Sequence, residues 1–278
     1  MKFIFFGTPR FAAIIVGGLI NQGFLPSAVV TNPDRPTGRK KIITPPPVKI
    51  ICRKLNPLLP ILQPEKIDDD FLNQLRKYDV DFFLVAAYGK ILPKSLIDIP
   101  RYGTIGIHPS LLPKLRGATP IQSAILSGLQ TTGITLFLID EKMDHGPIIS
   151  MKLLEINAND NAESLSDRLA VLGREMVVEI MPSISSLATQ SQNESEATYV
   201  SKFTANDAYI SPENLERAEK GIDNLAESVN CKIRGFFPEP GAWTHKNGKR
   251  VKLLSAEVLQ GKLVLKSIQV EGKKPRII

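Results

Sequence analysis

A histidine and an aspartate in two separate loops are the residues of this sequence best suited to acid–base chemistry. His108 directly follows an apolar segment and precedes Pro109, and Asp144 lies in a loop with Gly and Pro between two apolar segments. An imidazole can hydrogen-bond a reacting carbonyl oxygen, and a nearby carboxylate can fix its orientation and charge. A histidine that makes only a structural hydrogen bond is the other interpretation. From the residues alone, His108 and Asp144 can form an acid–base or oxyanion-stabilising pair, and a purely structural role for His108 stays open.

The segments around these two residues alternate between strand and helix patterns. Residues 2–6 are an apolar run that ends at Gly7-Thr8-Pro9, and the apolar positions after them recur at helical spacing. Further strands are expected at 27–31, 81–87, 103–107, 134–139 and 148–154, and further helices at 67–76 and from 160 onward. This alternation predicts an α/β fold, a Rossmann-like doubly wound and mostly parallel sheet. In such a sheet ligands bind at the carboxyl ends of the strands, where His108 would lie.

The composition changes in the last third of the chain. Residues 183–201 are rich in Ser, Thr, Gln and Asn, which predicts the end of a helix and a linker. One helical pattern at 212–228 follows, and then short β-like runs separated by Gly and Pro, which are typical of a small barrel. We therefore predict an α/β domain over 1–184, a linker over 185–206 and a small OB-like β-barrel domain over 207–278.

Positive charge is concentrated in two places. The formal net charge is +7, and residues 231–278 alone hold eleven Lys or Arg against three Glu. Residues 34–49 hold five basic residues and one acidic residue. Basic surfaces bind polyanions through phosphate contacts, so this distribution favours a nucleic-acid partner. A solvated surface that only keeps the protein soluble is the alternative.

The apolar segments and the cysteines are typical of a cytoplasmic protein. The longest apolar run, residues 82–87, is far shorter than the roughly 20 residues that a membrane helix needs. Cys52 and Cys231 lie far apart and outside any metal-binding spacing, which indicates two reduced, partly buried thiols. The sequence offers no ligand cluster for a metal.

Two blocks of the sequence match a known family. Ile107-His108-Pro109-Ser110-Leu111-Leu112-Pro113, followed by Arg116-Gly117-Ala118-Thr119-Pro120-Ile121-Gln122, resembles the active-site signature of the folate-dependent formyltransferases. Other segments, in the same order, resemble the branch of this family that acts on methionyl-tRNA: Phe6–Pro9, Pro33–Lys41, Pro47–Lys49, Ala87–Pro93, Thr132–Thr135, Met143–Gly146, Lys232–Phe236 and Pro240–Thr244. The resemblance covers nearly the whole chain.

The resemblance implies a reaction and its substrates. The formyl donor would be 10-formyltetrahydrofolate, the acceptor the α-amino group of methionine on initiator methionyl-tRNA, and no metal would be required. His108 would stabilise the oxyanion that forms when the amine attacks the formyl carbon. Asp144 would hold the histidine and help move a proton, through water. The walls of the pterin site, with largely backbone contacts, would be Ser110, Leu111, Leu112 and Pro113 together with Ala87, Tyr88, Gly89, Ile91 and Leu92.

One position departs from the family pattern. The family has an asparagine two residues before the histidine, where this chain has Gly106. On a strand, a side chain at this position would share a face with His108, and the loss of one oxyanion donor costs ~100- to 1000-fold in rate. Three explanations stay open: backbone groups or water replace the amide, the acceptor differs, or the site is weakened. Gly106 is therefore kept as a candidate catalytic position.

The resemblance also implies how the tRNA would bind. The basic loop would reach the acceptor end of the tRNA and meet its phosphates through Arg35, Arg39, Lys40, Lys41 and Lys49. The C-terminal barrel would bind the acceptor arm without reading bases, and Trp243 is expected in its core. The protein is expected to be a monomer. Two alternatives remain: a sugar-nucleotide N-formyltransferase, which needs no tRNA-binding domain, and a folate- or RNA-binding relative without catalysis.

Overall fold

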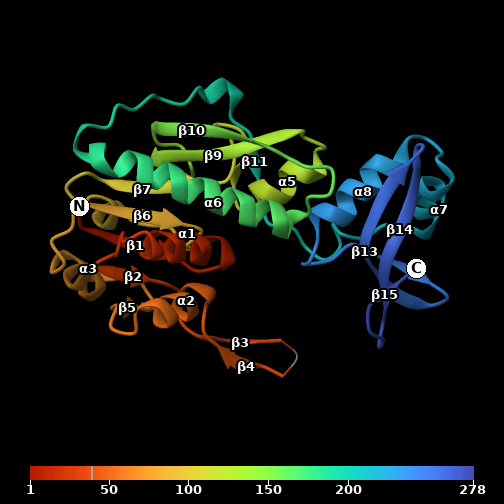
Figure 1. Cartoon of the computed structure of the whole chain (residues 1–278), viewed down its shortest axis with the longest axis horizontal. Coiled ribbons are helices and arrows are strands. Elements are labelled where there is room, and N and C mark those ends of the chain that lie inside the picture. The colour runs from red at the N-terminus through yellow and green to blue at the C-terminus, as the bar shows by residue number, and fades with distance from the viewer. Residues whose placement is uncertain (39) are drawn as a thin grey trace. The chain divides into compact units, whose positions relative to one another are not determined.

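The chain forms two compact units, each built from several segments of the sequence (Figure 1). The computed structural model describes residues 1–38 and 40–278. The first unit comprises residues 1–116, 133–153 and 167–198, and the second comprises 117–132, 154–166 and 199–278. The domain boundaries at 184 and 207 stay a prediction.

Strands and helices alternate along the first 200 residues, as the sequence pattern predicts. The strands are β1 (Phe3–Gly7), β2 (Ala28–Val30), β3 (Arg35–Thr37), β4 (Ile42–Thr44), β5 (Ile61–Leu62), β6 (Phe82–Ala86), β7 (Thr104–His108), β8 (Arg116–Gly117), β9 (Thr131–Leu138), β10 (Ile148–Glu155) and β11 (Tyr199–Val200). The helices are α1 (Arg10–Asn21), α2 (Pro47–Leu55), α3 (Asp69–Arg76), α4 (Lys94–Ile97), α5 (Pro120–Leu126) and α6 (Ala162–Ile180), and the 3-10 turns are η1 (Met181–Ser186) and η2 (Glu194–Glu196).

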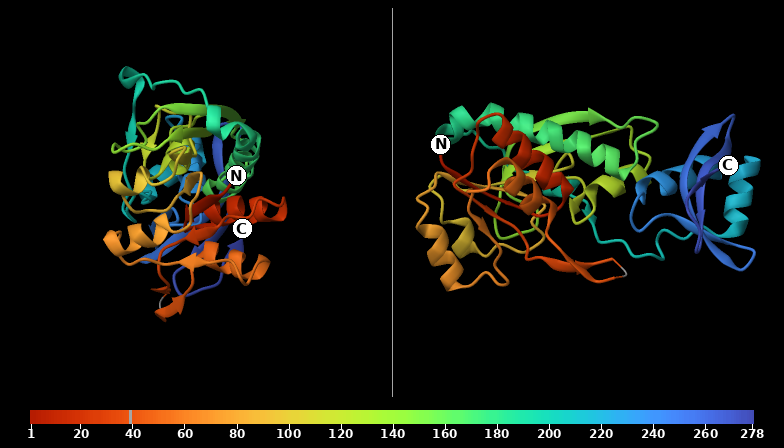
Figure 2. Two further views of the ribbon diagram at one scale, coloured as in Figure 1. Left: turned by 90° about the vertical axis from the view of Figure 1, so that its left-hand side faces the viewer. Right: turned by 60° about the horizontal axis from the view of Figure 1, so that its bottom comes forward.

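Seven strands form a central, mostly parallel sheet in the order β10-β9-β7-β6-β1-β2-β5. The pairs β6–β7, β1–β6, β1–β2 and β2–β5 are parallel, which confirms the predicted Rossmann-like class. β9 instead runs antiparallel to β7, with Thr135 opposite His108. The strands β3 and β4 lie outside this sheet and form a hairpin that extends away from it in the views of Figures 1 and 2.

The turn from β1 into α1 requires a glycine. A Cβ on Gly7 would lie 2.5 Å from the Cβ of Ala12 and 2.9 Å from the carbonyl oxygen of Ala86. Protein interiors tolerate no such overlap, so Gly7 lets the helix pack closely against β1 and β6. Asp68 likewise fixes the start of α3, since its carboxylate accepts a hydrogen bond from the backbone N–H of Phe71 at 3.1 Å.

Different elements pack on the two faces of β7, and this arrangement decides which of its residues lie at the site. Successive side chains of a strand point to opposite faces. Ile107 faces α6, because a Cβ on Gly173 of that helix would lie only 3.1 Å from the Cγ2 of Ile107. Gly106 and His108 therefore point to the other face. On that face a buried core joins β1, β2 and β6 to α3 and α4, with Ile4, Phe6, Val30, Phe71, Leu75, Phe83, Val85, Leu96 and Ile97 among its members.

The second unit contains the C-terminal helices and a small antiparallel sheet. Its elements after residue 200 are α7 (Pro212–Lys220), α8 (Leu225–Gly235), β12 (Trp243–Lys246), β13 (Lys249–Leu259), β14 (Lys262–Val270) and β15 (Arg276–Ile277). The small β domain expected at the C-terminus is confirmed. Within the described residues its four strands form one sheet whose edges are β12 and β15. Its core includes Leu215, Val229, Ile233, Val251, Leu253, Leu263 and Ile268.

Two expectations for this unit were wrong in detail. The single helix predicted at 212–228 is two helices, because Gly221 ends α7 in the left-handed conformation at a φ of 74°. Trp243, expected in the core, is half-buried. Its ring lies under the guanidinium of Arg250, 4.1 Å from the ring centroid, and its Nε1 donates to the carbonyl oxygen of Ala205.

Two further sequence expectations concern the helices and the thiols. None of the helices in residues 1–38 and 40–278 is long and apolar enough to cross a membrane. Cys52 and Cys231 are free and buried, as expected of two unpaired thiols.

Candidate active site

His108 is the last residue of β7 and is almost completely buried. Its Nε2 lies 3.0 Å from the carbonyl oxygen of Leu115, and its ring stands edge-on to that of Phe137 with the centroids 6.5 Å apart. A carbonyl oxygen can only accept, so Nε2 carries a hydrogen. The ring thus offers one N–H to an oxygen and turns its other nitrogen, Nδ1, toward Asp144.

Asp144 reaches His108 by an unexpected route. Because β9 is antiparallel to β7, the loop after β9 leaves the sheet where β7 begins, and Ile139 donates there to the carbonyl oxygen of Thr104. The loop then folds back until Oδ2 of Asp144 lies 3.7 Å from Nδ1 of His108. Asp144 takes the left-handed conformation, with a φ of 50°. The structure therefore brings the two residues together at ion-pair distance, slightly beyond a direct hydrogen bond.

The space beside Gly106 is filled by an aromatic ring. Gly106 is paired with Phe137 of β9, and a Cβ on Gly106 would overlap the ring carbons of Phe137 and lie 3.1 Å from Ile139. The same ring contacts His108 edge-on. Phe137 thus occupies the volume that a larger side chain at residue 106 would need. Sequence reasoning missed Phe137, because only the strand register shows that it faces Gly106.

The loop after His108 is held by a buried threonine. Thr135 is paired with His108, donates its hydroxyl hydrogen to the carbonyl oxygen of Ser110 at 2.7 Å, and accepts from the N–H of Leu112 at 3.1 Å. The Ser110 hydroxyl in turn donates to the carbonyl oxygen of Lys114 at 2.6 Å. The side chains of Ser110 and Leu112 are buried, while Leu111 and Pro113 are half-buried. The backbone of this loop is therefore fixed in place beside the histidine.

The segment 87–92 leaves the sheet next to His108, because β6 and β7 are parallel and Val85 is paired with Gly106. Ala87 and Gly89 are exposed and have positive φ values, and Ile91 is 88% exposed. Tyr88 and Leu92 are instead buried in the core. Burial raises the pKa of the Tyr88 hydroxyl to about 12. Only part of this predicted pterin wall is therefore accessible from outside.

The predicted tRNA-binding residues fall into two groups. Lys40 and Lys41 are exposed in the turn of the β3–β4 hairpin, while Arg39 lies outside the described residues. Arg35 pairs with Glu65. The ammonium of Lys49 lies at the base of the hairpin, 2.8 Å from Asp34, and its hydrogen bond holds the pKa of the Asp34 carboxyl below its usual range. The hairpin therefore has an exposed basic turn and a base in which Lys49 is already paired.

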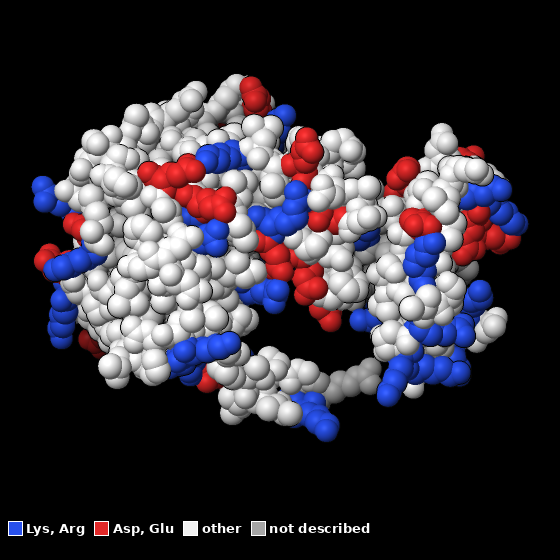
Figure 3. Space-filling view, in the orientation of Figure 1, with Lys and Arg blue, Asp and Glu red and all other residues white. Residues whose placement is uncertain are grey.

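Basic side chains also gather on the second unit. Figure 3 shows Lys and Arg over the sheet β12–β15, in keeping with the eleven basic residues of 231–278. Lys232 is an exception to this exposure, because it donates to the carbonyl oxygen of Tyr209 and burial lowers its pKa.

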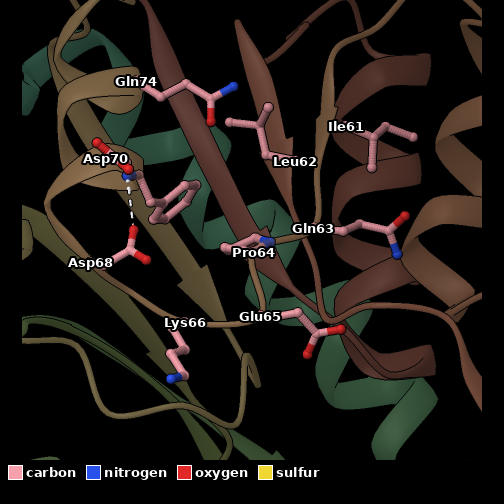
Figure 4. Close-up of a pocket in the computed structure, with 10 residues that line it drawn as sticks. Ile61, Leu62, Gln63, Pro64, Glu65, Lys66, Asp68, Asp70 and Gln74 are labelled. Carbon is pink, nitrogen blue, oxygen red and sulfur yellow. Dashed lines mark hydrogen bonds between the residues drawn. The ribbon is translucent and has the colours of Figure 1, made fainter.

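Two cavities lie near the first sheet. A cavity of about 500 Å³ is lined by Gln63, Glu65, Lys66, Asp68 and Gln74, together with apolar residues of β5 and α3 (Figure 4). Its lining includes none of the predicted catalytic residues. A smaller one, of about 240 Å³, lies between Ile97 and the start of the Asp144 loop at residues 139–142. Within the described part of the chain, no three His, Cys, Asp or Glu side chains are grouped as a metal site.

Known formyl transferases match both the N-terminal and the C-terminal part of this chain. Residues 1–181 match a family described as formyl transferase, and residues 222–267 match the formyl transferase C-terminal domain. A methionyl-tRNA formyltransferase of Thermodesulfovibrio yellowstonii is 41% identical over 260 residues, which cover 93% of this chain and 80% of that protein.

Solved structures share the fold at lower identity. The methionyl-tRNA formyltransferase from Clostridium thermocellum has a TM-score of 0.64 and 19% identity, with 97% of this chain and 98% of that chain covered. An N-formyltransferase from Helicobacter canadensis, in complex with folinic acid and dTDP-3-aminofucose, has a TM-score of 0.64 and 17% identity, with 97% and 95% covered.

Proposed function

This chain belongs to the formyl transferase family, and we propose that it transfers the formyl group of 10-formyltetrahydrofolate to the α-amino group of methionine on initiator methionyl-tRNA. The observation that carries the proposal is the His108–Asp144 pair at the end of β7, in a chain 41% identical to a methionyl-tRNA formyltransferase. We propose further that it acts as a monomer in the cytoplasm.

The residues around His108 fit a planar, partly apolar donor. Ile91 is 88% exposed in the segment beside His108, and Met143 is 62% exposed next to Asp144. Exposed apolar side chains in a functional loop gain stability when a ligand covers them. The backbone of 87–92 and of 110–113 would hold the folate, which supplies the formyl group when bound.

His108 and Asp144 supply the groups that acyl transfer to an amine needs. Attack of the amine nitrogen turns the formyl oxygen into an oxyanion. The Nε2–H of His108, which in the structure donates to the carbonyl oxygen of Leu115, would share its hydrogen between that carbonyl and the oxyanion and so stabilise the oxyanion. Asp144 faces Nδ1, so it orients the ring and stabilises a positive charge on it. The proton lost by the attacking amine would pass through this carboxylate to the departing nitrogen, by way of water.

Gly106 supplies no donor to this oxyanion. Since Phe137 fills the space beside it, we propose that a backbone N–H or a water held by the loop takes the place of an asparagine amide. His108 then carries a larger share of the stabilisation than in a site with two side-chain donors.

We propose that the tRNA binds through its phosphates to the β3–β4 hairpin and the basic C-terminal unit. Arg35, Arg39, Lys40 and Lys41 would contact the acceptor end, and Lys49 would act mainly by fixing Asp34 at the base of the hairpin.

The test is single-turnover formylation of two acceptors, initiator methionyl-tRNA and a nucleotide-linked amino sugar, with 10-formyltetrahydrofolate as donor. We expect transfer to methionyl-tRNA and none above background to the amino sugar. Transfer to the sugar alone would replace the proposal with a sugar-nucleotide N-formyltransferase. Folate binding without transfer to either acceptor would indicate a relative that has lost catalysis.

A further inference from the structure

A polar segment after α6 crosses the site without contributing a predicted catalytic residue. We call residues 190–198 the strap; it follows η1, contains η2 and appears in Figure 1 as an extended ribbon between α6 and β11. Its first residue is bridged to Ile148 of β10 by a pair of backbone hydrogen bonds, from Ile148 to Gln190 at 2.8 Å and from Gln190 to Ile148 at 2.9 Å. The strap belongs to the first unit, like His108 and Asp144.

Gln192 of the strap holds the backbone of the Asp144 loop. Its amide Nε2 donates to the carbonyl oxygen of Asp144 at 2.9 Å and to that of Gly146 at 2.8 Å. The two hydrogens of the Gln192 amide are thus donated to Asp144, which faces His108, and to Gly146. Because Asp144 takes a left-handed conformation that a non-glycine residue seldom adopts, these bonds hold a backbone that is strained by itself.

The oxygen of the Gln192 amide is hydrogen-bonded to the buried guanidinium of Arg116. This Oε1 accepts from Nη2 of Arg116 at 2.7 Å and from Nε at 3.1 Å. The Arg116 side chain is fully buried, and Nη2 also donates to Glu194 at 2.5 Å. This hydrogen bond holds the pKa of Glu194 below its usual range. A buried guanidinium leaves its site only at high cost, so it makes a fixed anchor for the amide.

His145 adds a second link between the strap and the Asp144 loop. Its Nδ1 lies 2.6 Å from Asp140, at the start of the loop, and its Nε2 lies 3.5 Å from Glu194 of the strap. The loop is thus tied to the strap at residues 144, 145 and 146, and the His145–Asp140 contact joins these residues to the start of the loop.

Thr198 of the strap holds the other partner of His108. Its hydroxyl accepts a hydrogen bond from the N–H of Leu115 at 2.8 Å, and its backbone bonds to Pro113 and Arg116. Leu115 is the residue whose carbonyl oxygen lies 3.0 Å from Nε2 of His108, and it too has a positive φ, of 59°. One short segment therefore contacts the residues on both nitrogen sides of the catalytic ring.

We infer that Gln192 and Thr198 are positioning residues for the formyl transfer: through them the strap fixes the carboxylate of Asp144 and the carbonyl of Leu115 on either side of the His108 ring. This inference rests on the proposed function of His108 and Asp144. Reacting groups must be held closely, since a displacement of about 1 Å can cost ~100-fold in rate. Neither residue contacts the reacting atoms, so each acts on the rate constant of transfer and not on substrate affinity.

The experiment compares matched substitutions in the strap and directly next to it. Gln192→Glu keeps the size and the acceptor toward Arg116 but removes the two N–H donors, and Gln192→Met removes both functions without adding charge. Gln190→Glu makes the same chemical change at an exposed side chain two residues away. Thr198→Val removes the hydroxyl, and Thr189→Val, at another exposed threonine just before the strap, is its control.

Three quantities are measured on each full-length variant: the melting temperature, the dissociation constants of folate and tRNA, and the single-turnover rate constant at saturating substrates. We expect both Gln192 variants to lower the rate constant about 10- to 100-fold, and Thr198→Val about 10-fold, with dissociation constants changed by less than about threefold. The two control variants should match the native chain. Rate constants of folded Gln192 variants within about twofold of native would overturn the inference.

A spectroscopic measurement tests this inference independently of the proposed function. The chain has three histidines, so the ¹⁵N-imidazole spectrum of labelled protein can be assigned with His145→Gln and His245→Gln. We expect Gln192→Met to shift the Nδ1 and Nε2 signals of His108, whereas Gln190→Glu leaves them in place. Unchanged His108 signals would refute the positioning role even if the native chain formylated neither acceptor. Should Gln192→Met fail to fold, Gln192→Glu and Thr198→Val decide the matter.

Discussion

Two loop regions of the first unit carry the two halves of the proposed function, and they are built in opposite ways. His108 and Thr135 are buried, and the loops around them are held by hydrogen bonds: Thr135 and Gln192 donate to backbone carbonyls, and Thr198 accepts from the N–H of Leu115. In the β3–β4 hairpin the lysines of the turn are exposed, and even apolar Ile42 and Ile43 are more than 60% exposed. The groups around His108 are held in a fixed geometry and carry little net charge. The turn of the hairpin is positively charged and exposed to solvent.

The difference follows from what each task requires. Stabilising an oxyanion depends on donors held within tenths of an ångström, which only a packed and hydrogen-bonded shell achieves. Binding phosphates depends on exposed charge and tolerates loose geometry, because Coulomb forces and counterion release act over longer distances. Substitutions in the first region should therefore change the rate of transfer, and substitutions in the second should change affinity for tRNA.

The largest effect is expected at the catalytic pair. Asp144→Asn should lower the single-turnover rate constant at least ~100-fold, and His108→Ala ~100- to 1000-fold, because the oxyanion donor or its orienting charge is lost. Folate affinity, measured by equilibrium titration, should change little. His245→Ala, at an exposed histidine of the second unit, is the matched control. Near-native turnover by Asp144→Asn would exclude the role given to it.

A second prediction concerns the space beside Gly106. Gly106→Asn alone should lower the free energy of unfolding by about 1–3 kcal/mol and should not raise the transfer rate, because Phe137 fills the site of the new amide. The double variant Gly106→Asn/Phe137→Met should regain most of the stability, since methionine is flexible enough to give way. Denaturant unfolding and single-turnover rates check both statements. A stable and faster Gly106→Asn single variant would show that Phe137 moves freely.

The hairpin should give a smaller effect that is confined to tRNA. Lys40→Glu/Lys41→Glu should raise KM for methionyl-tRNA about 10-fold or more, with the folate KM and the rate constant at saturation near native. The dependence of tRNA affinity on salt should also become shallower. Lys77→Glu, an exposed lysine after α3, serves as control. Equal changes in both KM values would contradict the separation of tasks.

The smallest expected effect is on stability at low pH. The hydrogen bond from Lys49 depresses the pKa of Asp34 below its ordinary 3.8 in the folded protein. The pair therefore stabilises the hairpin base above that pH, and its contribution is lost as the pH falls through the depressed value. The free energies of unfolding of native and Asp34→Asn protein should differ at pH 7 and converge as the pH falls below 3.8. A difference that stayed constant with pH would rule out the ion pair as its source.

The sequence was a good guide to the fold and to the closeness of His108 and Asp144, for physical reasons. Apolar runs bounded by Gly and Pro predicted the strands, and His108 at the end of one of them could lie only at the edge of a parallel sheet. The exposed turn of the basic loop was equally predictable, because Pro, Gly and a run of cations leave no apolar face to bury.

What the sequence could not predict depended on contacts between distant segments. The pairing of Gly106 with Phe137 and the antiparallel direction of β9 follow from strand register, which no local pattern specifies. The composition of the strap, which is rich in Gln, Ser and Thr, predicts part of a linker. Its polar side chains are instead partners of a buried arginine and of strained backbone, and composition does not distinguish such partners from solvated residues.

The most direct test of the division between a fixed catalytic region and an exposed basic one is the salt dependence of formyl transfer to initiator methionyl-tRNA. KM for the tRNA and the single-turnover rate constant at saturating tRNA are measured between low and moderate ionic strength. We predict that KM rises steeply with salt while the rate constant at saturation stays within about twofold. A flat KM, or a rate constant that falls together with tRNA affinity, would contradict the account.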